Sequence, residues 1–407
     1  MIKTYDRFRN FGYDLFRQLM QEKNPVISPV SVYLTLAMAG CGANGTTRTE
    51  FVDVLGEDMT ALSEDLMKTF SVKGDWLNLS VANSAWIDQR FIIHPAWADT
   101  IQSLMKTEIF KADLSACETM DKMNHWIATQ TNGLVPQLLT EPLEPKGLLR
   151  LALFNTVYFQ GKWESPFEPF NTHKEVFYLR DGQNDNWDKQ SQHRTVQVDM
   201  MRDRTANVTY LYNDFAEGVL LPYRMNQSDQ NKHTGFHVFE CLDTYKKRVD
   251  KGLGLIALKP KHNSSIRDVC SRLSGCAVHE MLSNRQIELA DLKIPRFKAA
   301  FDVDFIESLT KVGLTECFDM NRADLSLLGK DAETDDILYV SLVRQKAVLA
   351  VDEDGTEAAA VTELLGCLRA MADPQKQLYF NEPFLYIIMD LEKELPLFIG
   401  ILDDPDR

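Results

Sequence analysis

The spacing of apolar residues changes after about residue 147, and this change constrains the fold more than any other feature of the chain. Before it, apolar residues mostly recur every three or four positions, as in residues 96–110 (AWADTIQSLMKTEIF), which predicts amphipathic helices. After it, short β-type runs dominate, beginning with residues 149–163 (LRLALFNTVYFQGKW). Helical spacing returns at residues 265–273 (SIRDVCSRL). The sequence therefore predicts an α+β fold with several sheets around one continuous core.

The chain has no feature that divides it into separate domains. Its 407 residues contain no internal repeat, no low-complexity linker and no sharp compositional boundary. A chain of this length can bury a large core. Residues 180–195 (RDGQNDNWDKQSQHRT) are polar and rich in turn formers, which predicts a long exposed connection. We expect residues 1–407 to form a single domain.

Charge and hydropathy argue against two classes of partner. The net charge is −15, and the longest basic cluster, Lys246–Arg248, is short. Binding to nucleic acid or to an anionic membrane needs clustered Lys and Arg, so we expect neither partner. No apolar run is as long as a transmembrane helix. Residues 1–20 lack a signal-peptide core, so a cytoplasmic protein and the mature form of an extracellular one both remain open.

Motifs for enzymatic or metal chemistry are weak or absent. Residues 40–45 (GCGANG) match the dinucleotide pattern, but the segment before them reads as helix, which predicts a helix end followed by a loop. His233, His237 and Cys241 are four residues apart, yet their segment reads as strand, so we expect no metal site. The seven cysteines lack a CxxC pair, which favours reduced thiols. We expect no cofactor, although a dispersed Ser/His/Asp triad would leave no local signature.

A run of small residues between two β-type segments has two interpretations. Residues 353–368 contain good helix formers, and Thr356 could cap a helix. Alternatively, the even positions from 356 to 368 carry no charge, whereas Glu357 and Glu363 are odd. A strand with its even face buried would expose both carboxylates and could join a packed sheet without overpacking it. The pattern alone leaves helix and strand open.

Six motifs, taken in order, resemble those of the serpin family of serine protease inhibitors. Residues 353–362 (EDGTEAAAVT) resemble the family's hinge. The other five motifs are residues 24–31 (NPVISPVS), 155–163 (NTVYFQGKW), 292–298 (LKIPRFK), 379–384 (YFNEPF) and 396–400 (PLFIG). Because they span nearly the whole chain, the resemblance implies a serpin fold with three β-sheets, eight or nine helices and an exposed reactive-centre loop at about residues 353–378.

The resemblance also implies a mechanism of suicide inhibition by a metastable fold. A protease attacks the loop as a substrate and forms an acyl-enzyme, and the cut loop then inserts as a new strand of the main sheet. The protease is carried along and distorted, so deacylation stalls. Insertion must be faster than ester hydrolysis, which requires small, uncharged residues on the buried face of the hinge. The hinge positions are Glu353, Gly355, Thr356, Ala358, Ala360 and Thr362.

The position of the scissile bond follows from counting along the family's loop. Sixteen residues after Glu353 lies Arg369, followed by Ala370, and Arg suits a trypsin-like serine protease. Counting back from the 379–384 motif instead places the bond after Leu368, which would suit a chymotrypsin-like or elastase-like enzyme, or a cysteine protease. We prefer Arg369 because hinge-side length sets how far the loop inserts. Cys367 is interpreted as a substrate-side contact, with an oxidisable switch as the alternative.

Four polar residues match a cluster beneath the sheet that parts during insertion. Ser28, Ser31 and Asn155 carry the family's residue types. Gln345 stands where many serpins have a His, and unlike His it gains no charge near neutral pH. The departure therefore affects the chemistry of the cluster and leaves the fold assignment unchanged.

Two residues match positions where the new strand enters the sheet. Trp163 corresponds to the aromatic residue at that point. Arg296 lies where a basic residue commonly pairs with the hinge glutamate, so we predict an Arg296–Glu353 ion pair. The chain is thus predicted to be a monomeric inhibitor, not an enzyme, that forms a covalent complex with a trypsin-like protease. A non-inhibitory serpin acting as carrier or chaperone is the alternative, but the bulky or charged hinge residues that would favour it are absent.

Overall fold

The three-dimensional structure is a computed structural model that describes most of the chain. The described ranges are 2–142, 149, 151–179, 194–224, 251–261, 264–332, 334, 338–356 and 376–406. Within them lie nine α-helices: α1 (Ile2–Arg17), α2 (Pro29–Gly40), α3 (Gly45–Leu55), α4 (Met59–Thr69), α5 (Pro95–Met105), α6 (Cys117–Gln130), α8 (Ile266–Arg272), α9 (Gly275–Ser283) and α10 (Ile306–Lys311).

Three sheets make up the β-structure of the described residues, which confirms the predicted α+β class. The six-stranded sheet has the order β11 (Phe297–Asp304), β13 (Arg344–Val351), β14 (Gly355–Thr356), β5 (Leu151–Lys162), β2 (Leu77–Asp88) and β4 (Glu108–Ala112). The nine-stranded sheet has the order β1 (Val26–Ile27), β17 (Leu395–Leu402), β16 (Phe384–Asp390), β9 (Leu253–Pro260), β8 (Ala216–Pro222), β7 (Thr195–Tyr212), β10 (Gln286–Pro295) and β15 (Lys376–Tyr379), with β6 (His173–Tyr178) beside β7. The third sheet pairs β12 (Gly329–Asp331) with β3 (Phe91–Ile93).

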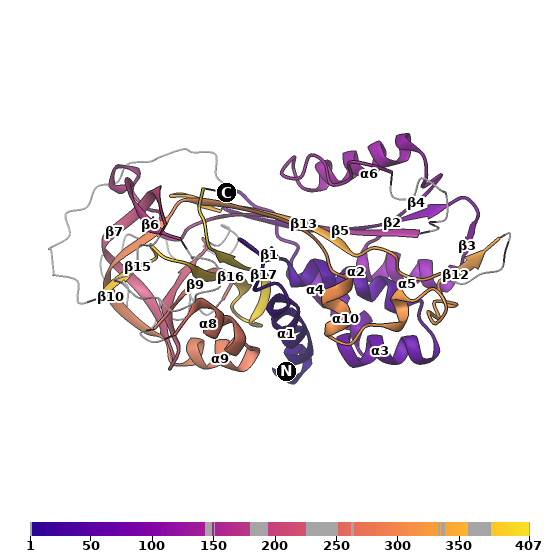
Figure 1. Cartoon of the computed structure of the whole chain (residues 1–407), viewed down its shortest axis with the longest axis horizontal. Coiled ribbons are helices and arrows are strands. Elements are labelled where there is room, and N and C mark those ends of the chain that lie inside the picture. The colour runs from indigo at the N-terminus through magenta and orange to yellow at the C-terminus, as the bar shows by residue number, and fades with distance from the viewer. Residues whose placement is uncertain are drawn as a thin grey trace.

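Helices cover both faces of the six-stranded sheet. In Figure 1, α6 lies above the sheet, whereas α2, α4 and α5 lie below it. The helices below belong to the main hydrophobic core, which continues to the nine-stranded sheet. Beneath α6 is a second, smaller cluster that includes Trp126 and Ile127 of the helix and Phe154 of β5. The six-stranded sheet is therefore the layer between two separately packed sets of helices.

The start of α2 follows from its sequence. Ser28 caps the helix by accepting a hydrogen bond from the backbone amide of Ser31, and Pro29 occupies the first turn, where its missing N–H costs nothing. The helix ends at Gly40, and α3 begins at Gly45. The GCGANG segment is thus a helix end and a connection, as predicted, and not a dinucleotide loop.

One stretch predicted as helix contains a strand. Within residues 96–110, α5 ends at Met105, and β4 begins at Glu108. Lys106 adopts left-handed backbone angles, with φ of 53°, and breaks the helix between them. The residues of β4 then pair in parallel with β2, so tertiary pairing outweighs the local helical spacing.

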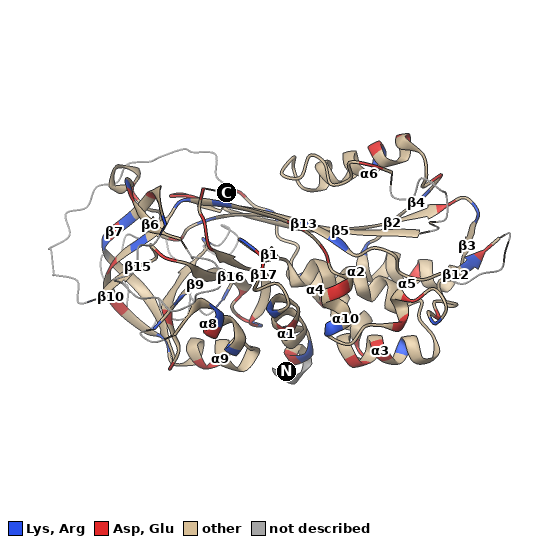
Figure 2. Cartoon of the chain, viewed as in Figure 1, with Lys and Arg blue, Asp and Glu red and all other residues tan. Residues whose placement is uncertain are grey.

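Several other expectations can be compared with the described residues. Their five cysteines are all free thiols: Cys41, Cys117, Cys270, Cys276 and Cys317. Acidic and basic residues are interspersed along the drawn ribbon (Figure 2). Over the described ranges, no helix has the length and apolar character to span a membrane, and no group of three His, Cys, Asp or Glu side chains could hold a metal ion. His233, His237 and Cys241, and most of the connection predicted at 180–195, lie outside the described residues.

Candidate functional site where the hinge enters the sheet

The two residues of β14 lie between two central strands of the six-stranded sheet. Thr356 pairs with Val351 of β13 on one side and with Gly161 of β5 on the other, both antiparallel. Strands β13 and β5 therefore run parallel to each other. In the part of the chain that the structure describes, they share no direct ladder, and β14 is what joins them. We call the stretch beyond Thr356, where β13 and β5 face each other without a shared ladder among the described residues, the opening of the sheet. A further strand could pair there with both of them.

A tight turn carries the chain from β13 into β14. The carboxylate of Asp352 accepts hydrogen bonds from the backbone amides of Asp354, at 3.0 Å, and Gly355, at 3.1 Å. Gly355 passes so close to β5 that a Cβ atom there would lie 2.0 Å from the carbonyl oxygen of Gly161. A residue with a side chain does not fit this position, which explains the glycine in the hinge.

The side chain of Thr356 is buried against an aromatic pair. Its hydroxyl is hydrogen-bonded to that of Tyr223 at 2.6 Å. The Tyr223 ring stacks on Trp163, with centroids 4.7 Å apart, and the Trp163 indole N–H donates to the carbonyl of Asp352 at 2.9 Å. Desolvation raises the pKa of Tyr223 well above its ordinary value, so this phenol stays neutral. The first even-phase hinge residue is therefore buried with its polar group satisfied.

Glu353 is held by three groups from other elements. The guanidinium of Arg296 forms two contacts with its carboxylate, Nη2–Oε1 at 2.6 Å and Nε–Oε2 at 3.1 Å. The predicted ion pair is present. The hydroxyl of Thr172 donates to Oε1 at 2.6 Å, and the amide of Phe167 donates to the Glu353 carbonyl at 2.9 Å. Burial alone would raise the pKa of Glu353, but the hydrogen bonds from Arg296 and Thr172 outweigh it and lower the pKa.

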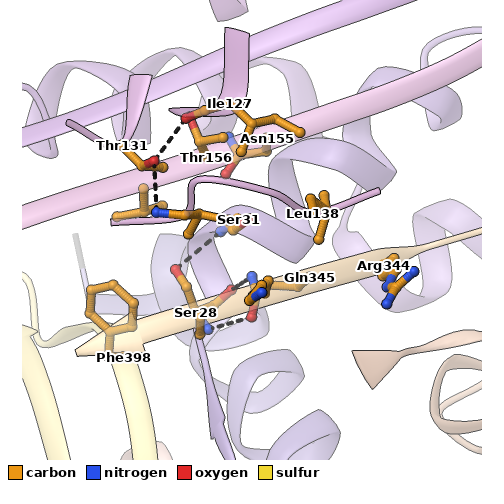
Figure 3. Close-up of a pocket in the computed structure, with 14 residues that line it drawn as sticks. Ser28, Ser31, Ile127, Thr131, Leu138, Asn155, Thr156, Arg344, Gln345 and Phe398 are labelled. Carbon is orange, nitrogen blue, oxygen red and sulfur yellow. Dashed lines mark hydrogen bonds between the residues drawn. The ribbon is translucent and has the colours of Figure 1, made fainter. Parts of the chain in front are cut away.

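A polar cluster lies further along the opening (Figure 3). The side-chain amide of Gln345 on β13 forms two hydrogen bonds with the backbone of Ser28. Its oxygen accepts from the Ser28 amide at 2.9 Å, and its nitrogen donates to the Ser28 carbonyl at 3.2 Å. On the other side of the opening, the side-chain amide of Asn155 on β5 donates to the side-chain oxygen of Asn83 on the neighbouring strand β2, at 2.7 Å. Ser28, Ser31, Asn155 and Gln345 line one cavity, so the structure brings together the four residues that the sequence assigned to this cluster.

The cavity between β5 and β13 is small and is lined by both polar and apolar residues. Its volume is about 30 Å³, which is room for about two water molecules. Among the described residues, the buried atoms Asn155 Oδ1 and Thr156 Oγ1 have no hydrogen-bond partner. Buried acceptors without a partner carry a desolvation cost. This point of the sheet therefore has unused hydrogen-bonding capacity.

The predicted site residues form two groups. Glu353, Gly355, Thr356, Trp163 and Arg296 meet where the hinge enters the sheet, and the polar cluster lies beneath the opening. The predicted positions further along the loop lie outside the described residues: Ala358, Ala360, Thr362, Cys367, Leu368, Arg369 and Ala370.

Two contributors were missed by the sequence analysis. Thr172 and Tyr223 lie 181 and 133 residues from their hinge partners, and neither belongs to a motif that the sequence analysis used. The one signal in the sequence is that Thr172 lies shortly after the 155–163 motif.

Comparison with known proteins identifies relatives of the whole chain. The model of the serpin (serine protease inhibitor) family matches residues 6–405. Iripin-5 of the tick Ixodes ricinus is 28% identical over 402 residues, which cover 96% of this chain and 92% of that protein. The crystal structure of the thermophilic serpin tengpin in its native state has 26% identity, covers 99% of this chain and 94% of its own, and gives a TM-score of 0.82. Tengpin in its latent state has 25% identity, covers 98% of this chain and 97% of its own, and gives a TM-score of 0.76.

Proposed function

The chain belongs to the serpin family, and on this basis we propose that it is an irreversible suicide inhibitor of a trypsin-like serine protease. The protease forms an acyl-enzyme with the reactive loop, and the cleaved loop inserts between β13 and β5 before the ester is hydrolysed. The family model is that of serine protease inhibitors, which supports an inhibitor and not an enzyme. We expect the inhibitor to act as a monomer built from a single domain, residues 1–407.

The observation that carries the proposal is the position of β14 in the opening of the sheet. Thr356 already pairs with strands on both sides. Each residue that follows it into the opening would add ladder hydrogen bonds and bury side-chain surface. An uncut loop, held again at β15, has no free end with which to complete this movement. Cleavage therefore releases a favourable process that the intact chain cannot finish.

The register of β14 supports insertion by the cleaved hinge. Thr356 pairs with Gly161 and Val351, so each step of two residues along the hinge moves two residues back on β5 and β13. Continuing this register would bring Thr362 between Asn155 and Gln345. Residues opposite each other in antiparallel strands share a face of the sheet, so the Thr362 hydroxyl would meet the orphaned Asn155 Oδ1. An inserted hinge would thus satisfy a buried acceptor.

The other hinge positions fit the same register. Ala358 would lie between Phe159 and Leu349, two large buried residues, and its small side chain would avoid overpacking. In the same register Glu357 would lie between Gln160 and Ala350, which are only half-buried. The inserted hinge would therefore combine small residues toward the core with a charge outside it, as rapid insertion requires.

The proposed target class depends on Arg369. In the acyl-enzyme the Arg369 carbonyl carbon is bonded to the protease serine, and Ala370 starts the released side. A guanidinium suits a specificity pocket that holds a carboxylate, as in trypsin-like proteases. The alternative bond after Leu368 would direct the inhibitor to proteases with an apolar pocket.

Trypsin tests the proposal directly. We expect a mixture of the protein and trypsin to give a band near the summed mass on a denaturing gel, together with loss of trypsin activity. Cleavage of the protein while trypsin remains fully active would contradict inhibition. Arg369→Glu is the control, because it should abolish complex formation with trypsin and leave the melting temperature unchanged.

Mass spectrometry of the released C-terminal fragment distinguishes the two candidate bonds. A fragment that starts at Ala370 supports cleavage after Arg369. A fragment that starts at Arg369 would place the bond after Leu368 and reassign the target class.

A further inference from the structure

We propose that Phe170 is a second contact for the attacking protease, separate from the reactive loop, and that it increases the rate of complex formation. The inference rests on the proposed inhibitory function. Phe170 lies in the 3₁₀ turn η1 (Pro169–Asn171). Its side chain is 72% exposed, the largest value among the large apolar side chains of the described residues. An aromatic ring in this position contributes little to the core and is available to a partner.

The turn that carries Phe170 is rigid. Backbone hydrogen bonds close it at Asn171 N–Glu168 O, 2.9 Å, and Thr172 N–Pro169 O, 3.1 Å. Pro169 has a fixed φ angle, which further restricts the backbone. An aromatic side chain on a restricted turn loses little conformational freedom on docking, so more of its contact energy appears as affinity.

Contacts on both sides of the turn place it at the hinge end of the reactive loop, and the strand that follows, β6, leads to the other end. Before the turn, the amide of Phe167 donates to the carbonyl of Glu353, where the hinge begins. After it, Thr172 donates to the Glu353 carboxylate, and β6 follows at once. At the far end of β6, the amide of Tyr178 donates to the carbonyl of Asn381, just after β15 brings the chain back. Figure 1 shows β6 and β15 at the same end of the molecule.

The dimensions of the loop bring a protease close to this turn. The chain takes twenty steps from Thr356 to Lys376, so no point on the loop lies more than about 35 Å from the nearer end. A protease of about 230 residues has a radius of gyration of about 17 Å, and hence a diameter of about 45 Å. The surface of a protease bound to the loop therefore lies within about 35 Å of a loop end, and a body about 45 Å across is wide enough to reach back over that end. Phe170 stands at the hinge end, beside the exposed charges of Glu168 and Lys174, where such a body would contact it.

The test is the second-order rate constant for inhibition of trypsin by the full chain. We expect Phe170→Ala to lower this rate constant about tenfold, the effect of truncating one anchor residue at an interface. Phe170→Tyr should keep it within about twofold, because the ring is retained. Met320→Ala is the matched control, since Met320 is 71% exposed in the turn after η3 (Glu316–Phe318), away from the loop's ends, and should change nothing. Equal rate constants for Phe170→Ala and Met320→Ala would overturn the proposal.

A second measurement separates docking from insertion, because the turn also contacts Glu353. In a Thr356→Arg background the loop should be cleaved as a substrate, and kcat/KM then reports docking and cleavage without insertion. We expect Phe170→Ala to raise KM in that background. A slower inhibition rate with unchanged KM would mean that Phe170 acts through the hinge, which contradicts the proposal. If the wild-type chain forms no covalent complex with trypsin, the inhibitory function itself fails; if it does and Phe170→Ala forms it equally fast, only the Phe170 contact fails.

Discussion

Gln345 and Ser28 are joined by two hydrogen bonds beneath the opening, Ser28 N–Gln345 Oε1 at 2.9 Å and Gln345 Nε2–Ser28 O at 3.2 Å. The Gln345 side chain accepts from the Ser28 amide and donates to its carbonyl, which a neutral carboxamide does at any pH. Many serpins have a His at this position, whose charge changes near neutral pH. The link between β13 and the start of α2 is therefore independent of protonation in this chain.

Replacing this amide with an imidazole should make the opening sensitive to pH. We expect Gln345→His to lower the melting temperature more at pH 5.5 than at pH 8, because protonated His has no acceptor for the Ser28 amide. The measurement is the difference in melting temperature from wild type at both pH values. Gln345→Asn is the control, since its shorter amide should lower stability equally at both. A pH-independent difference for the His variant would contradict this account.

The Arg296–Glu353 pair should contribute stability that depends on pH. The pKa of Glu353 is lower in the folded protein than its ordinary value, so the pair stabilises the fold above about pH 4.3, and the contribution is lost as pH falls through the folded pKa. We expect Arg296→Gln to destabilise the protein by about 1–3 kcal/mol at pH 7. This loss is smaller than for a fully buried ion pair, because the Arg296 side chain is 47% exposed and solvent screens its charge.

Thermal unfolding at pH 7 and pH 3.5 checks the sign of this effect. The penalty of Arg296→Gln should shrink at the lower pH, because below the ordinary pKa of Glu353 protonation of its carboxylate increasingly competes with the ion pair. Arg296→Lys keeps the charge without the two-pronged geometry and should fall between wild type and Gln. An equal penalty at both pH values would remove the ion pair as its cause.

Two substitutions of Thr356 separate the contribution of its hydroxyl group from that of its size. We expect Thr356→Arg to convert the inhibitor into a substrate of trypsin, because Thr356 is buried against Tyr223 and a long charged side chain does not fit there. Thr356→Val keeps the shape and loses the hydroxyl, so it should still inhibit, with a loss of about 1 kcal/mol in stability. The ratio of complex to cleaved inhibitor on a denaturing gel measures both. Full inhibition by the Arg variant would show that the hinge does not enter the sheet.

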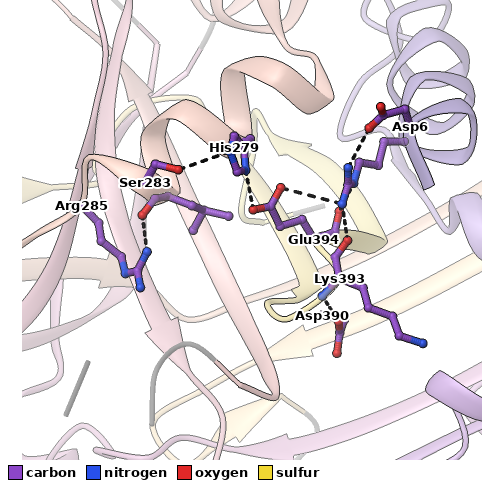
Figure 4. A network of polar contacts seen from close by, with 9 residues as sticks. Asp6, His279, Ser283, Arg285, Asp390, Lys393 and Glu394 are labelled. Carbon is purple, nitrogen blue, oxygen red and sulfur yellow. Dashed lines mark hydrogen bonds and ion pairs between the residues drawn. The ribbon is translucent and has the colours of Figure 1, made fainter. Parts of the chain in front are cut away.

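Arg9 joins α1 to the turn between β16 and β17, within the network shown in Figure 4. Its buried guanidinium donates to the carbonyl oxygens of Lys393, at 2.5 Å, and Glu394, at 3.2 Å, and to the carboxylate of Asp6, at 2.9 Å. His279 of α9 contacts the Glu394 carboxylate at 2.7 Å. The network therefore connects three elements that are distant in sequence.

Removing the buried partner should cost far more than removing the exposed one. We expect Arg9→Ala to destabilise the fold by about 2–4 kcal/mol, because two carbonyl groups lose their donor in a buried position. Asp6→Asn, at the exposed end of the network, should cost less than about 0.5 kcal/mol. Chemical denaturation of both variants makes the comparison. Similar losses for the two would show that the network is uniformly solvated.

The sequence correctly predicted much of the fold and the contact between Arg296 and Glu353. Ser28 and Pro29 specify the start of α2 through local capping, and the GCGANG segment ends a helix for equally local reasons. The motif that contains Arg296 led to the prediction that Arg296 pairs with Glu353. The end of α5 and the strand β4 were missed, since the pairing of β4 with β2 is not visible in its own residues.

The sequence by itself determined the family, the small even-phase hinge and the identity of most residues around the opening, because those properties are carried by motifs and by local periodicity. The tertiary structure decided how they meet. It added Thr172 and Tyr223 as hinge partners and set the register in which Thr356 lies between β13 and β5. Apart from the local pairing with β13, these contacts join segments more than a hundred residues apart. Their geometry depends on how the strands align, which no single stretch of sequence encodes.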